Sequence, residues 1–412
     1  MSRHASHAAA ACALMALLGN ADIAVAQVAG QDVSPLVLPN PDYDYDGLRL
    51  GGATVMAKID ASAQYDSNVF ATSQIAIDDY RFLIEPSISI KRQSGTIAAS
   101  AEAYGVIRRH AEQTRENSED YGASIEFRQA WNERQNFSIS SGYIHGTESR
   151  ADPETRLGPT DLPRQINVLR AEVIYRQPIG RLAVQARGGI DINNFLDPAD
   201  DDRDVRTTRA LLQLSYRTSP GFDVFVDGYV NRRDFRLAQD FSGVNRDTNT
   251  VGANIGIHKE VGQRLRGRIA IGFFRALPDN PSLTPYTEFG GSAEVVWTPR
   301  TRTALSLRFT RGDEGTVRSG ANGLTDTNVR VRINQEIRHN LTATLTASYN
   351  IRDYRGTVPR RLKTARANGE VEYRVSRHIA LWAGITYATR DAEDIFDRFA
   401  QKTATAGLRW KI

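Results

Sequence analysis

Residues 341–349 read Leu-Thr-Ala-Thr-Leu-Thr-Ala-Ser-Tyr, with an apolar or aromatic side chain at every odd position and a hydroxyl at every even position. Successive side chains of a β-strand point to opposite faces, so this alternation predicts a strand with one apolar and one polar face. It is longer than the average soluble strand of about five or six residues. The pattern is typical of a strand that crosses a bilayer. We place Leu345 toward lipid and Thr344 toward the lumen.

The same alternation recurs from Gly51 to the end of the chain, with breaks between the segments. About eighteen such segments begin near Val55, Tyr80, Thr96, Tyr121, Phe137, Leu169, Leu182, Ala210, Phe222, Val251, Leu265, Phe289, Thr303, Val329, Leu341, Ala365, Ile379 and Thr403. An even number is expected for bacterial single-chain barrels. We therefore predict an all-β fold over residues 52–412, a transmembrane antiparallel up-and-down β-barrel of about 18 strands, with about 16 as the alternative.

Tight turns follow the even-numbered segments, and longer connections follow the odd-numbered ones. The turns include Gln93-Ser94-Gly95, Pro178-Ile179-Gly180, Ser219-Pro220-Gly221, Glu260-Val261-Gly262, Pro299-Arg300-Thr301 and His339-Asn340. Short periplasmic turns and long outer loops are the asymmetry of outer-membrane barrels. This registry predicts that both ends of the barrel domain lie in the periplasm.

The composition excludes other classes. Lys and Arg number 52 and Asp and Glu 48, a formal net charge of +4 over 412 residues, and no basic block occurs, so we expect no nucleic-acid partner. The mean hydropathy is −0.42. Beyond the first twenty residues no apolar run approaches the roughly 18 residues of a helical membrane span. A membrane β-barrel is compatible with this low mean hydropathy and with the lack of a long apolar run, because one face of each strand meets lipid and the other meets water.

The N-terminus is expected to be a targeting segment. Arg3 precedes an apolar stretch over residues 8–18, and Ala24-Val25-Ala26 supplies small residues for cleavage, so we predict a signal peptide over residues 1–26. The single cysteine, Cys12, lies inside that stretch, and a lipidation site there is disfavoured because the box lacks its large aliphatic residue. Residues 27–51 are rich in Pro, Asp and Gly, and we predict a flexible periplasmic segment.

A soluble sandwich or propeller is the alternative for an alternating pattern. Strands of ten or more residues weigh against it. Aromatic residues near the strand ends also weigh against it, because they could form the two girdles of a membrane barrel. They are Tyr65, Trp131, Tyr143, Tyr175, Tyr216, Trp297, Tyr349, Tyr387 and Trp410.

The polar faces carry charges that would line the lumen of such a barrel. The candidate lumen-lining arginines are Arg128, Arg170, Arg187, Arg209, Arg217, Arg266, Arg268, Arg308, Arg330, Arg332, Arg366 and Arg374. The interspersed carboxylates are Asp60, Glu102, Glu126, Glu172, Asp191, Asp227, Glu294, Glu336, Glu370 and Glu372. A ladder of cross-strand ion pairs would stiffen the wall. An excess of inward arginine would make the pore weakly attractive to anions. Both interpretations stay open.

No catalytic or metal-binding pattern emerges. His110, His145, His258, His339 and His378 lack metal-ligand spacing. Ser141 and His145 on one strand would be about 13 Å apart, too far to share a proton. The acidic stretch over residues 197–204 lacks the glycine and spacing of a calcium loop, so we expect a solvated outer loop. We predict no enzyme activity, no cofactor and no metal.

The first outer loop opens on Tyr65-Asp66-Ser67-Asn68-Val69-Phe70. This motif resembles the signature at the same place in the putative beta-barrel porin family 2, a bacterial outer-membrane family whose members often occur beside exopolysaccharide synthesis and export genes. The resemblance covers about residues 51–412, mostly through strand architecture. Asp66 and Asn68 can also cap a turn, which gives the motif a structural interpretation. One departure is the last residue, Ile412, where such barrels usually end in an aromatic; Trp410 has the same facing.

The resemblance implies an outer-membrane barrel that forms or lines an exit path for a secreted, acidic exopolysaccharide. Two alternatives remain: a general or small-solute porin that prefers anions, and a structural or receptor barrel with a plugged lumen. The expected partners are outer-membrane lipid, lipopolysaccharide, the barrel-assembly machinery and components of polysaccharide export. The expected location is the bacterial outer membrane.

Overall fold

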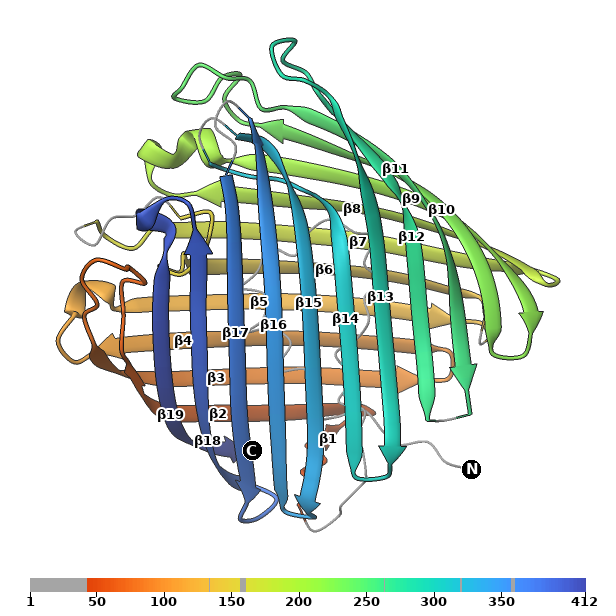
Figure 1. Ribbon diagram of the computed structural model, residues 1–412. Coiled ribbons are helices and arrows are strands. Elements are labelled where there is room, and N and C mark those ends of the chain that lie inside the picture. The colour runs from red at the N-terminus through yellow and green to blue at the C-terminus, as the bar shows by residue number, and fades with distance from the viewer. Residues whose placement is uncertain (1–42, 133, 156–160, 263, 319–320, 357–359) are drawn as a thin grey trace.

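The computed structural model describes residues 43–132, 134–155, 161–262, 264–318, 321–356 and 360–412. Eighteen long antiparallel strands, β2 to β19, form one closed barrel (Figure 1). Each strand pairs with its neighbours in sequence, and β19 pairs with β2 to close the barrel. The predicted fold class and strand number are therefore confirmed.

The eighteen strands correspond one for one to the alternating segments, although some begin several residues earlier, such as β15 at Ala321 rather than near Val329. They are β2 Ala53–Asp66, β3 Asp79–Ser94, β4 Ile97–His110, β5 Ser118–Ala130, β6 Asn136–Thr147, β7 Gln165–Ile179, β8 Leu182–Phe195, β9 Val205–Ser219, β10 Phe222–Phe235, β11 Thr248–Val261, β12 Leu265–Pro278, β13 Tyr286–Arg300, β14 Thr303–Glu314, β15 Ala321–Arg338, β16 Leu341–Gly356, β17 Arg360–Arg374, β18 Ile379–Ala392 and β19 Phe399–Lys411. The described helical turns are short: η1 Thr114–Glu116, η2 Pro198–Arg203 and η3 Ile395–Asp397.

The facing of the strands follows the alternation. Leu345 on β16 is 51% exposed on the outward face. Its neighbour Thr344 points inward, where its hydroxyl donates to Asn334 Oδ1 at 3.1 Å. Many large apolar side chains are exposed on the strands, as expected for a surface that meets lipid.

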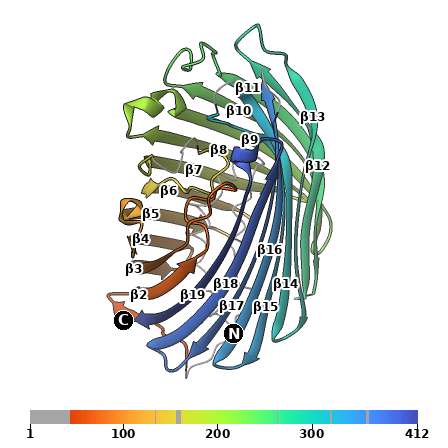
Figure 2. The ribbon, with the colours of Figure 1, turned by 60° about the vertical axis from the view of Figure 1, so that its left-hand side comes forward.

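The two ends of the barrel differ. At one end the strands join by tight turns, such as those at Gly95 and Gly180, whose positive φ angles of 57° and 61° suit glycine. The C-terminus lies toward this short-turn end in Figure 1. At the opposite, long-loop end lie η1, η2 and η3 (Figure 2). The predicted asymmetry between turns and loops is present.

The outward aromatic residues form two belts. Tyr143, Tyr349 and Tyr387 are exposed toward the long-loop end, and Tyr65 lies near them with its hydroxyl bonded to Asp78. At the short-turn end, the exposed aromatic residues include Trp131, Tyr175, Tyr216, Trp297 and Trp410. Two aromatic belts separated by an apolar band mark the two interfaces of a bilayer.

The N-terminal part of the described chain packs on the short-turn rim. Strand β1, Leu48–Leu50, pairs with the start of β2. Asp44 lies 3.0 Å from Arg374, and the rings of Tyr45 and His378 are 4.9 Å apart. Of the segment predicted to be flexible, residues 43–51 therefore have defined contacts with the barrel. The predicted signal peptide, Cys12 and residues 27–42 lie outside the described residues. In the described part of the chain, no helix has the length and apolar character needed to span a membrane.

Candidate pore constriction

Residues 148–155, which follow β6, enter the barrel and reach its opposite wall. We call them the docked segment. The Glu154 carboxylate accepts hydrogen bonds from the Tyr354 hydroxyl at 2.6 Å and from Thr316 Oγ1 at 2.7 Å. Tyr354 lies on β16, which is separated from β6 by nine strands in one direction and seven in the other. The docked segment therefore crosses the lumen near the long-loop end.

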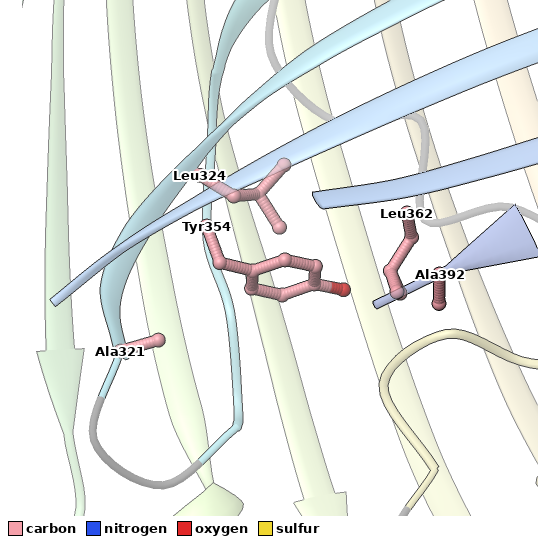
Figure 3. Packing of buried hydrophobic residues seen from close by; sticks show 5 residues of the cluster. All are labelled: Ala321, Leu324, Tyr354, Leu362 and Ala392. Carbon is pink, nitrogen blue, oxygen red and sulfur yellow. The ribbon is translucent and has the colours of Figure 1, made fainter. Parts of the chain in front are cut away.

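The wall that receives the docked segment carries a buried apolar cluster. Its members are Ala321, Leu324, Tyr354, Leu362 and Ala392, and Figure 3 shows the side chains of Leu324, Tyr354 and Leu362 directed into one region. Leu324, Tyr354 and Leu362 are at most 2% exposed although they occupy the inward positions of their strands. Large apolar side chains on a lumen wall need a cover. The contact between Tyr354 and Glu154 places the docked segment beside them.

A second apolar contact anchors the docked segment farther along the wall. Ala151 packs against a buried cluster of Ala71, Ala388 and Phe399. The Arg390 guanidinium donates to the Ala151 carbonyl oxygen. Apolar packing and hydrogen bonding thus act at the same point of the segment.

Charged side chains surround Glu154 on several sides. Arg352 on β16 lies 3.6 Å from its carboxylate, and Arg203 donates to its carbonyl oxygen at 3.2 Å. Arg318, which follows β14, donates to the Pro153 carbonyl oxygen at 2.7 Å. Burial by itself would raise the pKa of Glu154, but Arg352 and the hydroxyl donors outweigh it, so this pKa lies below its ordinary value. Glu154 is therefore a buried, charged contact.

Ion pairs also join the outer loops to one another. Arg246 lies 3.7 Å from Asp202 and 3.5 Å from Asp240, while Arg318 donates to Asp397 at 3.0 Å. Arg203 pairs with Glu148 and, at 3.2 Å, with Asp200. The acidic loop near Asp200 is thus largely neutralised by arginine. Among the described residues, no group of three or more potential ligands is arranged to hold a metal ion.

The candidate lumen-lining arginines fall into groups. Six of them pair with carboxylates in short ladders: Arg170 and Arg209 with Asp191, Arg187 with Glu172, Arg217 with Asp223, Arg308 with Glu294, and Arg374 with Glu372. Arg268 donates to Gln213 at 2.7 Å and stacks on the Phe225 ring. Arg128 and Arg266 are exposed toward the short-turn end. Arg330, Arg332 and Arg366 lie on β15 and β17. A role of these arginines in conduction stays a prediction.

The inward carboxylates take different partners. Asp60 lies 2.6 Å from Lys58 and 2.8 Å from Arg409, and Asp227 accepts from Asn254 at 2.7 Å. Glu336 lies 3.7 Å from Arg302 near the short-turn end. The ladder interpretation thus fits part of the wall, because carboxylates separate many of its cations.

The motif over residues 65–70 lies where the first and last barrel strands meet. Asp66 accepts from the Asn68 backbone N–H at 3.0 Å, which caps the turn. The Gln401 amide on β19 donates to Asp66 at 2.9 Å, and Asn68 donates to the Ala400 carbonyl oxygen at 3.0 Å. Asp66 and Asn68 are each 1% exposed. The motif therefore joins the barrel seam, and it meets the docked segment at Arg150, whose guanidinium lies over the Phe70 ring.

Ser141 and His145 do not interact. The ring of His145 stacks on Tyr121, and its Nδ1 lies 2.9 Å from Asn167. Ser141 is paired in the ladder with Ala171 and Ile125.

Sequence reasoning missed the docked segment and its receptors, including Glu154, Arg203, Arg318, Arg352 and Arg390. One signal was available. Leu324, Tyr354 and Leu362 are large apolar residues at positions whose neighbours on the same face are polar. On a strand that alternates between lipid and water, such residues mark a covered part of the lumen wall.

A closed barrel of long strands, with an apolar outward face and two aromatic belts, is typical of outer-membrane proteins. The protein is a porin-like β-barrel of the outer membrane. The model of the family "Putative beta-barrel porin 2" matches residues 40–412, and the chain belongs to this family. The resemblance drawn from the motif and the strand pattern is thus confirmed.

Several solved outer-membrane proteins are similar to this chain at low identity. The outer membrane protein OpdK of Pseudomonas aeruginosa has 13% identity and a TM-score of 0.45, with 87% of this chain and 99% of that chain covered. The FrpB iron transporter of Neisseria meningitidis has 9% identity and a TM-score of 0.43, with 81% and 62% covered. The siderophore receptor PirA of P. aeruginosa has 7% identity and a TM-score of 0.42, with 87% and 80% covered. No curated protein matches the chain.

Proposed function

We propose that this protein is a diffusion channel for small, preferentially anionic solutes, and that the docked segment limits the size of what passes. The observation that carries the proposal is the contact of Glu154 with Tyr354 and Thr316 on the opposite wall. A segment that crosses the lumen reduces the open cross-section of the barrel. Eighteen strands otherwise leave room for an aqueous channel.

The preference for anions is proposed from the inward arginines. Rings of cationic side chains favour the entry of anions into a pore. Several of these arginines, such as Arg209 with Asp191, are balanced by carboxylates. We therefore expect a moderate preference rather than strict selectivity.

Exopolysaccharide export, which the family resemblance implies, is the second candidate. A polymer chain would need the docked segment to move aside. One observation favours such movement: among the described residues, no backbone-to-backbone hydrogen bond joins residues 148–155 to strands β14–β19. Side chains hold the segment at that wall, so it could leave without breaking a strand ladder.

The test compares the wild-type barrel with Glu154→Gln in planar lipid bilayers and in liposome swelling assays. The variant keeps the size of the side chain but removes its charge from Arg352 and the hydroxyl donors. Glu393→Gln, which alters an exposed carboxylate in another outer loop, is the matched control. We expect the wild type to admit small sugars and anions and to exclude oligosaccharides, and Glu154→Gln to raise both the conductance and the size limit.

A wild-type channel that conducts no ions, or that passes oligosaccharides as readily as small solutes, would overturn the size-limited porin. Deletion of the gene separates the two candidates in the cell. Impaired uptake of small anions with normal polymer secretion supports the porin, and reduced secretion with normal uptake supports export.

A further inference from the structure

We propose that Arg308, Arg330, Ser348 and Arg366 form a binding site for a small solute with at least two anionic groups, such as a di- or tricarboxylate. The inference rests on the proposed function, because the solute reaches this wall through the lumen. It goes beyond that function by naming a site and a ligand class.

The strand register places the four residues in one row. Arg308 on β14 is directly opposite Arg330 on β15, Arg330 is opposite Ser348 on β16, and Ser348 is opposite Arg366 on β17. Neighbouring strands lie about 4.8 Å apart, so the backbones at Arg330 and Arg366 are about 10 Å apart. Their long side chains can approach a ligand from both sides of Ser348.

The charge balance of this row differs from that of the ladders elsewhere. Asp191 lies between Arg170 and Arg209 and pairs with both. In the proposed site two arginines are directly opposite each other, an arrangement that destabilises a sheet. Glu294 approaches Arg308 at 3.5 Å from the β13 side. No carboxylate occupies a position in the row between Arg308 and Arg366.

Arg366 shows this imbalance most clearly. Within the described part of the chain it forms no salt bridge, and its side chain is exposed although it lies on the inward face of β17. The charges that act on it are Arg330 and Asp152 of the docked segment. Arg332 is the next inward-facing residue after Arg330 on β15, toward the short-turn end. Its Nε is buried and has no hydrogen-bond partner. At Arg366 the wall therefore presents to the lumen a guanidinium that no carboxylate of the described chain engages in a salt bridge.

The chemistry of the row fits carboxylate or phosphate groups. A guanidinium presents a planar fork of donors that binds either group through two parallel hydrogen bonds. The Ser348 hydroxyl adds a donor between the two forks. Because Arg330 and Arg366 stand on either side of it, a solute with two anionic groups can engage both arginines at once.

The test measures citrate binding to the full mature chain in detergent micelles by isothermal titration calorimetry. The site variant is Arg330→Gln with Arg366→Gln. The control is Arg300→Gln with Arg338→Gln, which removes the same charge from exposed turns beside the same wall. A third variant, Arg330→Lys with Arg366→Lys, keeps the charge and removes the fork. Circular dichroism and heat-dependent gel mobility verify folding of each variant.

We expect the wild type to bind citrate, the glutamine site variant to bind it at least about tenfold more weakly, the lysine variant to be intermediate, and the control to match the wild type. No citrate binding by the wild type, or equal weakening in the site and control variants, overturns the inference. If the wild-type channel prefers anions but the glutamine site variant binds citrate as well as the wild type does, the binding site is refuted and the proposed porin is retained. If citrate binding depends on the site but the channel shows no preference for anions, the anion-preferring porin is refuted and the site is retained.

Discussion

The side-chain amide of Asn68 donates a hydrogen bond to the backbone carbonyl oxygen of Ala400, 3.0 Å away, and so joins two residues 332 positions apart in the chain. The same amide donates to the Thr72 carbonyl oxygen at 2.8 Å, and Asn68 Oδ1 accepts from the Thr72 N–H at 3.2 Å. One side chain therefore shapes the first outer loop and attaches it to β19. The distinctive motif of the chain stabilises the point where the barrel closes.

Replacing Asn68 by Ala is expected to destabilise the barrel. The change leaves buried backbone groups without their partners, at a cost of about 1 to 3 kcal/mol. Urea unfolding in lipid vesicles measures the effect, with Gln74→Ala in an exposed part of the same loop as the control. If both variants unfold at the same urea concentration, the seam contact has no energetic role.

Arginine substitutions on β16 test the facing of the strand. Leu345→Arg places a cation in the bilayer near its midplane and should cost about 2 to 4 kcal/mol. Thr344→Arg points into the lumen and should cost only the hydrogen bond to Asn334, about 1 kcal/mol. Folding stability in lipid is the measurement. Equal costs, or the reverse order, would refute the assigned facing.

The conductance is expected to depend on pH only under acidic conditions. The folded-state pKa of Glu154 lies below its ordinary value of 4.5, because Arg352, Arg318 and the hydroxyl donors outweigh burial. The charged contact is therefore complete above the ordinary pKa and is lost as pH falls through the lower, folded-state value. Single-channel conductance should stay constant from about pH 7 to 5 and rise at lower pH.

Glu154→Gln should remove this acid transition and show high conductance throughout. A rise in wild-type conductance between pH 7 and 5, or an acid transition that persists in the variant, would show that another group controls the segment.

Removing the carboxylate shared by two arginines should change selectivity as well as stability. Asp191→Asn leaves Arg170 and Arg209 without their common counter-ion. Both arginines are partly exposed, so we expect each lost ion pair to cost at most about 1 kcal/mol. The reversal potential in a salt gradient should shift toward greater anion preference. A shift toward cations would mean that this ladder does not face the conducting path.

The fold could be predicted because a membrane strand is a local pattern. The alternation in residues 341–349 places each side chain toward lipid or water without reference to the rest of the chain. The number of such segments predicted the eighteen strands, and the turn and loop lengths predicted which strand ends lie together. The arginine positions on the inward faces followed from the same period of two.

The docked segment and the seam depend instead on contacts between residues far apart in sequence. Nothing local to Glu154 indicates that it meets Tyr354, 200 positions later, because that meeting requires the barrel to be closed. In the same way, the register alone reveals that Arg308 and Arg330 stand opposite each other while Asp191 separates Arg170 from Arg209. The sequence by itself determined the strands and their two faces, since these arise from backbone geometry. The tertiary structure decided which charges are paired and what crosses the lumen, since hydrogen bonds and ion pairs act only between groups that the closed barrel brings within a few ångströms.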